Sequence, residues 1–491
     1  MATQIKARSA QVLAILMMER TGPCGRASCH IHFRAVVSCG IERDRRTIVN
    51  TDMAKLGIIM NRRHFLGSAA AAAIVPCGVL AAPARYQLRA EPVIKQILPP
   101  GDGATRMLGF NGSMPGPELR VRRGQPLTVA VENGLEDGTA IHWHGIRLDN
   151  RMDGVPMLTQ KTIPPKATHT YSFVPPDAGT FWYHSHYLSH EQVALGMMGP
   201  LIIEEDTPPD VDRDITVLIS DWMMQEDGTL VGDFANRHSV AHGGYMGNYA
   251  KAFLSGQDVQ IGDRVRFRLI NAATNRIFPV TVGGVSGQIV ALDGMALATP
   301  RPLSDLILAP AQRVDLIVDV TGRVTFDMIT RQDPYLLAEL VPVGTNANRT
   351  QAPVPPLPPH GLPQPAEPAQ HLTLTMMGGA MGGRHGGDNI WAFNNVSDLP
   401  ADPFGTFTQG ETARITLVND TSFAHGIHLH GHHFFEVGPD GALGDLRDTT
   451  LVSAGESRDI LCVFDNPGKW LLHCHMLSHQ VGGMKTWVSV A

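Results

Sequence analysis

The chain contains 491 residues, of which 43% are hydrophobic and 18% charged, and its formal net charge is −6. This length exceeds one ordinary domain and indicates two to four, with enough apolar residues for large cores. The negative charge argues against nucleic acid as a partner. Glycine (50 residues) and proline (35 residues) are plentiful, which favours short strands joined by many turns.

The N-terminal region carries the pattern of an export signal. Arg62 and Arg63 precede an alanine-rich apolar run that leads to Ala82-Pro83-Ala84. A twin arginine, a modest apolar stretch and an Ala-x-Ala sequence are typical of a bacterial Tat signal peptide, cleaved here after Ala84. Pro76 and the shortness of the run argue against a buried helix or a membrane anchor.

This signal sets the expected start and location of the protein. We predict a signal peptide at residues 60–84, a true start at Met60 and a mis-called extension at residues 1–59. The mature protein is then expected to use the Tat export machinery, to reach the periplasm or the medium, and to have no stable membrane anchor.

Only two of the six cysteines lie beyond this leader, Cys462 and Cys474. Cys462 stands in the apolar run Ile-Leu-Cys-Val-Phe and is predicted to be a buried strand residue. Cys474 stands between two histidines, and we expect it to bind a metal rather than to form a disulfide.

One strand pattern occurs three times along the chain, at Gly124–Asn133, Gly262–Asn271 and Gly410–Asn419. In each copy asparagine follows glycine by nine residues, with alternating apolar side chains between them. The alternation predicts strands, and a spacing of roughly 140 residues predicts three similar β-domains.

The domain boundaries follow from these copies and from composition. We predict β-domains at residues 85–206, 207–350 and 371–491. Residues 351–370 are rich in proline, which suits an extended connector better than a packed core.

A second pattern links the first and last domains only. Gly179–His186 parallels Gly468–His475, whereas the corresponding middle copy, beginning at Gly322, has no histidines. We therefore expect the first and third domains to carry metal ligands and the middle domain to act as a spacer.

Four clusters of candidate metal ligands stand on this repeated frame. On a strand each His-x-His pair aims two imidazoles to one side. A single pair fits structural histidines or a zinc hydrolase at least as well, but four clusters on related strands indicate a larger metal centre. They are His142 and His144; His184 and His186; His425, His428, His430 and His432; and His473, Cys474 and His475.

The last cluster has donors on both faces of its strand. His473 and His475 are expected on one face and Cys474 on the other. His479 and Met484 follow closely enough to fold back toward Cys474. A thiolate, two imidazoles and a weak thioether form a blue-copper site, so the rest of the chain must supply one more histidine.

With these clusters in place, the chain from about residue 86 to the end resembles the three-domain multicopper oxidases, the family of laccases, bilirubin oxidases and bacterial cuprous oxidases. The resemblance implies three cupredoxin-like Greek-key β-sandwich or barrel domains. It also implies four coppers in each chain (one type 1, one type 2 and two type 3), with the trinuclear cluster between the first and third domains.

The resemblance assigns each ligand by position. It implies a type 1 site of His425, Cys474, His479 and axial Met484. It implies type 2 ligands His142 and His428. The implied type 3 ligands are His144, His184, His186, His430, His473 and His475.

The same resemblance implies the reaction. A laccase-like enzyme oxidises phenolic or other small organic reductants by one-electron steps and reduces dioxygen to water with four electrons. Cys474 is expected to pass electrons to the trinuclear cluster, and Met484 implies a moderate type 1 potential. Asp153 resembles the acid that supplies protons beside that cluster, although an Asp-Gly pair is also a common turn.

Several residues depart from the family pattern. Gly426 stands where proline is usual, and Gln480 stands where a proton-relaying glutamate is frequent. Thr421 and Phe423 occupy positions where cuprous oxidases present aspartate and methionine. We therefore expect organic reductants to be preferred to Cu(I).

Two alternatives stay open, namely a cuprous oxidase for copper tolerance and a cupredoxin-fold structural protein without copper. The segment Met376–His385 fits either a soft Cu(I) site or, as we prefer, a flexible glycine loop. The remaining histidines and one methionine lack a partner at ligand spacing and are expected on the surface or in loops; they are His238, His242, Met246, His360 and His433.

Overall fold

The computed structural model describes residues 82–349, 353–380 and 390–491. The predicted extension and residues 60–81 of the predicted signal peptide lie outside the described residues. The strand β1 (Ala84–Lys95) begins at the last residue of that predicted peptide, and the Ala84 N–H donates to the Pro126 carbonyl oxygen over 2.9 Å. Within the described part of the chain, no helix is long and apolar enough to cross a membrane.

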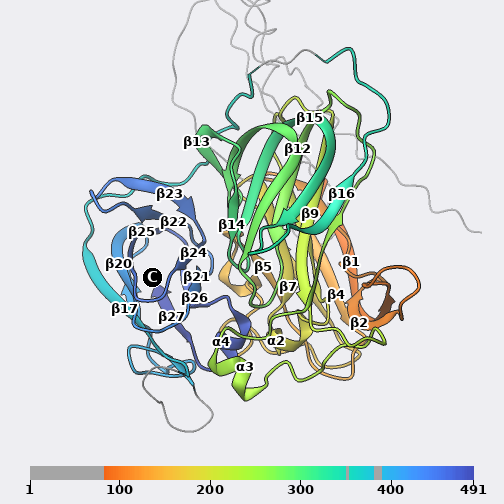
Figure 1. Cartoon of the computed structure of the whole chain (residues 1–491). Coiled ribbons are helices and arrows are strands. Elements are labelled where there is room, and N and C mark those ends of the chain that lie inside the picture. The colour runs from red at the N-terminus through yellow and green to blue at the C-terminus, as the bar shows by residue number, and fades with distance from the viewer. Residues whose placement is uncertain (1–81, 350–352, 381–389) are drawn as a thin grey trace, which may run out of the picture. The chain divides into compact units, whose positions relative to one another are not determined.

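The first strands form two four-stranded sheets (Figure 1, orange to yellow). In the order of their pairing, the strands of one sheet are β2 (Thr105–Phe110), β1, β4 (Leu127–Asn133) and β6 (Thr168–Phe173). Those of the other are β3 (Leu119–Arg122), β8 (Met198–Glu204), β7 (Gly179–Ser185) and β5 (Ile141–His144).

The middle strands form one eight-stranded sheet (Figure 1, green). Its main path is β10 (Tyr249–Leu254), β9 (Arg213–Trp222), β11 (Arg264–Asn271), β15 (Arg313–Met328), β12 (Phe278–Leu292) and β13 (Met295–Pro302). Off this path, β14 (Leu306–Leu308) pairs with β12 and β16 (Tyr335–Leu340) pairs with β15.

The last strands form a six-stranded and a five-stranded sheet (Figure 1, blue). The larger sheet runs β18 (Trp391–Phe393), β17 (Gln370–Gly378), β20 (Glu411–Asn419), β25 (Ser457–Phe464), β22 (Phe434–Val437) and β23 (Leu443–Arg447). The smaller runs β19 (Gly405–Phe407), β27 (Lys485–Val490), β26 (Gly468–Cys474), β21 (His425–Leu429) and β24 (Thr449–Val452).

Helical structure in the described residues is confined to short turns. They are the 3-10 helix η1 (Asn150–Met152), α2 (Ser189–Gln192), α3 (Arg237–Ala241) and α4 (Leu477–Val481). The helices α2 and α3 both contact α4. The all-β class predicted from the glycine and proline content is confirmed.

The three predicted copies of one strand are β4, β11 and β20, and they occupy equivalent places. Each runs parallel to one neighbour (β1, β9 or β17) and antiparallel to the other (β6, β15 or β25). The repeat in the sequence is therefore a repeat of the same three-stranded unit.

The spacing that the three copies share places a buried asparagine at the end of each strand: Asn133, Asn271 and Asn419. In each case the side-chain oxygen accepts the N–H two residues later, over 2.9, 3.0 and 3.1 Å respectively. The amide nitrogen donates to carbonyl oxygens across the following loop. Because these buried carbonyls need donors, asparagine holds the turn closed.

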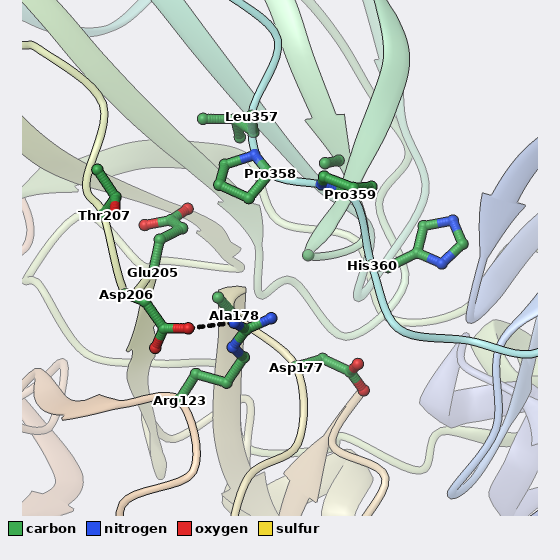
Figure 2. A pocket seen from close by; sticks show the side chains of 12 residues that line it. Arg123, Asp177, Ala178, Glu205, Asp206, Thr207, Leu357, Pro358, Pro359 and His360 are labelled. Atoms are coloured by element: carbon green, nitrogen blue, oxygen red, sulfur yellow. Dashed lines mark hydrogen bonds and ion pairs between the residues drawn. The ribbon is translucent and has the colours of Figure 1, made fainter. Parts of the chain in front are cut away.

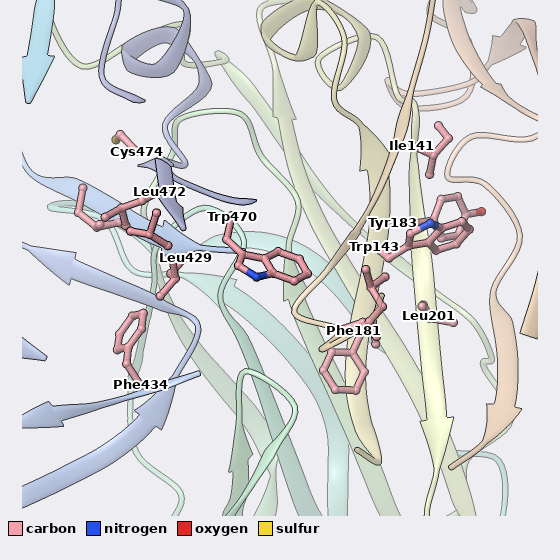
Figure 3. Packing of buried hydrophobic residues seen from close by; sticks show 14 of the residues in the cluster. Ile141, Trp143, Phe181, Tyr183, Leu201, Leu429, Phe434, Trp470, Leu472 and Cys474 are labelled. Atoms are coloured by element: carbon pink, nitrogen blue, oxygen red, sulfur yellow. The ribbon is translucent and has the colours of Figure 1, made fainter. Parts of the chain in front are cut away.

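The strands that carry histidines pair with one another. In β5 and β7, His142 lies opposite His184, and in β21 and β26, His428 lies opposite His473. The strand β26 alternates as predicted: Cys474 belongs to the hydrophobic core with Trp470 and Leu472 (Figure 3), whereas His473 faces other imidazoles.

The hydrophobic core is continuous between the first and last groups of strands. One cluster of buried residues includes Trp143 and Tyr183 from the first group and Trp470 and Leu472 from the last. The middle sheet has a core of its own, which includes Phe267 and Phe326. The packing thus brings the histidine-bearing strands of the two ends of the chain together.

Candidate metal centre

Three predicted donors, His425, Cys474 and His479, meet at a buried site. We call these three residues, together with Met484, whose backbone is hydrogen-bonded to Cys474 and His479, the thiolate cluster. Cys474 Sγ lies 3.6 Å from His425 Nδ1 and 3.7 Å from His479 Nδ1. The two Nδ1 atoms are 3.0 Å apart. All four side chains are fully buried.

Backbone bonds hold the thiolate cluster together. The Cys474 N–H donates to the Met484 carbonyl over 3.1 Å, and the Met484 N–H donates to the His479 carbonyl over 3.0 Å. His479 lies on α4, whose first N–H groups are satisfied by Thr274 O (2.8 Å) and Asn275 Oδ1 (3.1 Å). Because both partners precede β12, the middle segment supports this site and is more than a spacer.

The outer nitrogen of each imidazole in the thiolate cluster has a fixed partner. His479 Nε2 lies 2.8 Å from the His242 carbonyl, which can only accept, so Nε2 carries the proton and Nδ1 faces Cys474 with its lone pair. His425 Nε2 lies 2.8 Å from Thr421 Oγ1. Such outer bonds orient ligand imidazoles.

Eight further histidines form what we call the histidine cluster. Their imidazoles are buried, and their ring centroids approach to between 3.8 and 6.0 Å. They come from β5, β7, β21 and β26 and the residues just after these strands. They are His142, His144, His184, His186, His428, His430, His473 and His475.

Backbone carbonyls fix the tautomer of four of these imidazoles. Nδ1 lies 2.8 Å from Asp153 O in His142, 3.0 Å from Ser185 O in His184, and 2.8 Å from Asp448 O in His428. In His473 it lies 2.9 Å from Cys474 O. A carbonyl only accepts, so each Nδ1 is protonated and each Nε2 keeps its lone pair.

Carboxylates fix the tautomers of two more imidazoles, those of His430 and His144. Asp153 Oδ2 lies 3.0 Å from His430 Nδ1, and Asp153 Oδ1 lies 3.2 Å from His142 Nδ1. Asp448 Oδ1 lies 3.2 Å from His144 Nε2. Asp153 and Asp448 are both buried. The first was predicted from the sequence, and the second was not.

The imidazole nitrogens that face the centre of the histidine cluster are placed as ligand atoms for a cation. Among the described residues, several have no hydrogen-bond partner, including His142 Nε2, His144 Nδ1 and His184 Nε2. His430 Nε2 and His473 Nε2 lie 3.1 Å apart, yet both rings have their proton on the opposite nitrogen. Two lone pairs at this distance repel unless a cation lies between them.

Burial keeps these donors free of protons or, for the thiol, poised to lose one. It lowers the pKa of His144, His184, His186, His428, His430 and His475 well below the ordinary value, and neighbouring imidazoles lower it further. It lowers the pKa of His473 to about 3 and of His479 to about 4. Burial raises the pKa of Cys474 to about 12, so a metal must displace its proton.

The donor sets fit copper. A cysteine, two histidines and a methionine are typical of a blue-copper site, and all-imidazole sets suit copper well. The two clusters are also joined: Cys474 belongs to one, while its neighbours His473 and His475 belong to the other. The Cys474 carbonyl accepts the His473 Nδ1 proton, which adds a second connection.

Two expectations from the sequence need correction. His433 was expected on the surface or in a loop; it lies in the segment between β21 and β22, but it is buried, with Nε2 at 3.6 Å from Asp448 Oδ2. The residues Met376–Gly378 were expected in a flexible loop, but they end β17, and Met376 is fully buried. An apolar strand can end in methionine and glycine, which the loop interpretation overlooked; residues 381–385 lie outside the described residues.

Asp448 gave a weak signal in the sequence. Arg447 ends β23 and Asp448 alone separates it from β24, and a charged pair between two strands is buried only with partners. The predicted strand residue Cys462 is confirmed in β25, where it is fully buried.

The cavity shown in Figure 2 is separate from both clusters. It measures about 210 Å³ and is lined by residues including Glu205, Pro358 and His360. Arg123 and Asp206 form an ion pair on its wall. None of the predicted ligands lines it.

Three models of the multicopper oxidase family match the chain, at residues 94–208, 213–339 and 366–491. The multicopper oxidase MmcO of Mycobacterium tuberculosis is 28% identical over 431 residues, covering 77% of this chain and 82% of that protein. A copper resistance protein A homolog of Pseudomonas syringae pv. tomato is 27% identical over 533 residues, covering 78% of this chain and 89% of its own length.

Solved structures agree. Lac15 from a marine microbial metagenome is 51% identical, with a TM-score of 0.73, covering 83% of this chain and all of that one. A multicopper oxidase from Pseudomonas thermotolerans is 30% identical, with a TM-score of 0.75, covering 84% of this chain and all of its own. The three matched regions, the half-identical relative and the buried donor sets show that this chain belongs to the multicopper oxidase family, as a three-domain, laccase-like oxidoreductase.

Proposed function

We propose that the thiolate cluster is a type 1 copper site and that the histidine cluster holds one type 2 and two type 3 coppers. The enzyme then oxidises phenolic or other small organic reductants and reduces dioxygen to water. The observation that carries this proposal is the set of buried imidazoles whose outer nitrogens are occupied by acceptors while their inner lone pairs converge.

Bound copper would supply one-electron transfer at the thiolate cluster and four-electron reduction of dioxygen at the histidine cluster. The chain itself provides the path between them, because Cys474 is covalently continuous with His473 and His475. Asp153 can hold a proton at Oδ1 or Oδ2 and move it toward the space that His142 and His430 enclose.

The donor side of the thiolate cluster favours organic reductants. His425 and His479 are fully buried, so a reductant must approach groups that cover them. His479 Nε2 reaches the His242 carbonyl, and the His242 ring lies 5.9 Å from the half-buried Phe423 ring. Phe423 in turn lies 5.8 Å from Trp391, which packs 5.1 Å from His425.

Aromatic rings at this position suit a substrate ring better than a cuprous ion, which prefers sulfur ligands. Thr421 is also committed, because its hydroxyl contacts His425 Nε2. Of the relatives, one is named a copper resistance protein A homolog and another, from Cryptococcus neoformans, is named Laccase-1. The cuprous oxidase therefore remains the second candidate.

A direct comparison tests the proposal. Purified protein is expected to bind four coppers per chain and to oxidise a methoxyphenol with higher catalytic efficiency than chelated Cu(I). Deleting residues 376–386 would remove part of β17, so Met381→Ala with His385→Ala is the better test of the Cu(I) route. Purified protein that binds no copper would refute the proposed oxidase function. Fast Cu(I) oxidation that the double variant loses would favour the second candidate.

We also propose export by the Tat pathway to the periplasm or the medium, supported by Arg62, Arg63 and the Ala82–Ala84 sequence. The proposed domains are residues 85–206, 207–350 and 371–491, with a connector at 351–370. Protein recovered from the periplasm should begin at Arg85. Replacing both arginines with lysine should leave it in the cytoplasm with its leader attached; unchanged export would refute this route.

A further inference from the structure

Arg313, on β15 of the middle sheet, reaches the histidine cluster through one carboxylate. Its side chain is fully buried, with Nη1 at 2.9 Å from Asp448 Oδ1 and Nη2 at 2.6 Å from Asp448 Oδ2. Nε donates to the Thr180 carbonyl over 3.1 Å, and Nη1 also donates to the Ala311 carbonyl over 3.1 Å. Every nitrogen of this guanidinium is thus fixed by an acceptor, which leaves it one orientation.

Asp448 passes this constraint to two imidazoles. Its Oδ1 lies 3.2 Å from His144 Nε2, and its backbone carbonyl accepts His428 Nδ1–H over 2.8 Å. Thr449 Oγ1 lies 2.8 Å from Asp448 Oδ1 and 3.2 Å from His428 Nδ1. The carboxylate position therefore sets which nitrogen of His144 is protonated and where its other nitrogen points.

The strand next to this pair is shaped to admit it. Gly145 follows His144, and a Cβ there would lie 2.5 Å from both Arg313 Nη2 and Asp448 Oδ2. Any larger residue would displace the pair. On the far side, Asp293 Oδ1 accepts the main-chain N–H of Arg313 over 2.9 Å, and Asp293 Oδ2 lies 3.0 Å from Arg447 Nε.

Other buried arginines nearby have a different role. Arg266 is fully buried in β11 and pairs with Asp315 at 2.6 Å and Glu205 at 2.7 Å. Arg268 in the same strand pairs with Asp214 at 2.6 Å. These carboxylates are not among the groups that contact the histidine cluster in the described residues, so the arginines hold strands together and serve no imidazole.

We propose that Arg313 is a positioning residue for the proposed trinuclear site, because its two-pronged grip on Asp448 fixes the aim of His144 and His428. The middle segment thereby takes part in the dioxygen half of the reaction while supplying no ligand. This inference rests on the proposed function, since it takes His144 and His428 as copper ligands.

Lysine is the informative substitution, because it keeps the charge but cannot bind both carboxylate oxygens in a fixed plane. In Arg313→Lys we expect the type 2 copper EPR signal to change, and reoxidation of the reduced enzyme by dioxygen to slow by about 10- to 100-fold. The blue type 1 band and its rate of reduction by a methoxyphenol should stay as in the wild type. Arg266→Lys is the matched control, since it disturbs an equally buried ion pair.

Two comparisons decide the proposal. If Arg313→Lys and Arg266→Lys share the same EPR signal and reoxidation rate, Arg313 is only structural and the proposal is overturned. If Arg313→Lys does not fold, Asp448→Asn, which has the same shape, must show the altered type 2 signal with an unchanged blue band. A wild-type protein without copper would instead refute the proposed function and leave the Arg313–Asp448 geometry intact.

Discussion

The outer nitrogens of the cluster imidazoles explain how the free chain is prepared for metal. Carbonyl oxygens accept from His142, His184, His428, His473 and His479, so each ring is oriented before any cation arrives. An imidazole already in place loses little conformational freedom on binding. Single substitutions should therefore act on one cluster and spare the other.

Replacing Cys474 by serine should remove the blue thiolate–copper band and turnover with organic reductants. Cys474 Sγ lies 3.6 Å from His425 Nδ1 and 3.7 Å from His479 Nδ1, and a hydroxyl is a poor substitute for a thiolate. The coppers of the histidine cluster should stay bound, as measured by copper content and EPR. A blue variant would disprove this assignment.

Replacing Asp153 by asparagine should slow dioxygen reduction roughly 10- to 100-fold and spare reduction of the type 1 site. The carboxylate contacts both His142 and His430, and an amide can neither carry the negative charge nor deliver a proton. Stopped-flow reoxidation across pH measures the effect. Rates equal to the wild type at every pH would remove Asp153 from the proton path.

At the scale of strands and turns, the asparagine that ends each repeated strand gives a matched pair of substitutions. Asn419 holds the turn that carries Thr421 and leads to His425, whereas Asn133 holds the equivalent turn of the first group of strands through hydrogen bonds that involve no residue of the thiolate cluster. Each loses several buried hydrogen bonds on truncation to alanine. The turn should thus affect only the stability of the fold in one copy, but both stability and the thiolate cluster in the other.

We expect Asn419→Ala and Asn133→Ala each to lower the free energy of unfolding by roughly 2–4 kcal/mol. Only Asn419→Ala should shift the type 1 absorption band, because His425 loses its support from Thr421. Denaturant unfolding and visible spectra of the two variants measure both effects. Equal spectral shifts would mean that the turn does not act through His425.

These strands were also the part of the site most open to prediction. Alternation on β5 and β26 separates His142 and His144 from Trp143, and His473 from Cys474, by local geometry alone. Arg313 and Asp448 could not be found this way, because they are 135 residues apart and meet only when separate sheets pack. The turn α3, which covers His479 through His242, is too short to give a periodic signal.

At the scale of the whole molecule, so many buried neutral histidines make the copper-free protein sensitive to acid. In the unfolded chain histidine has a pKa near ~6.5, while burial lowers the pKa of His479 to about 4 and of His473 to about 3. Between these values the unfolded chain binds more protons, so stability falls as the pH falls. Each such group contributes at most about 1.4 kcal/mol per pH unit.

Copper-free protein should therefore unfold at markedly lower denaturant concentration at pH 5.5 than at pH 7.5. His186→Gln should reduce the proton uptake on unfolding by about one, because burial lowers the pKa of His186 well below its ordinary value. Denaturant midpoints measured across this pH range test both statements. A flat profile would show that the imidazoles reach water before the fold opens.

The global fold was predictable because the chain repeats one strand unit three times, but the contribution of the middle unit was not. Its strands lack histidines, and the sequence around Arg313 and Asn275 does not indicate that these residues contact Asp448 and Ser478. Such contacts are a property of packing between units rather than of the pattern within any one of them.

The histidine cluster draws on strands from opposite ends of the chain, as His142 on β5 and His473 on β26 illustrate. A ribosome makes the N-terminal strands first, and they can fold while the rest is still being synthesised. The imidazoles of the first half of the site are therefore made early, and those of the second half are made almost last. Loading of the complete site must consequently follow translation, because a chain stalled before β26 lacks His473 and His475 and also Trp470 and Leu472 of the shared hydrophobic core.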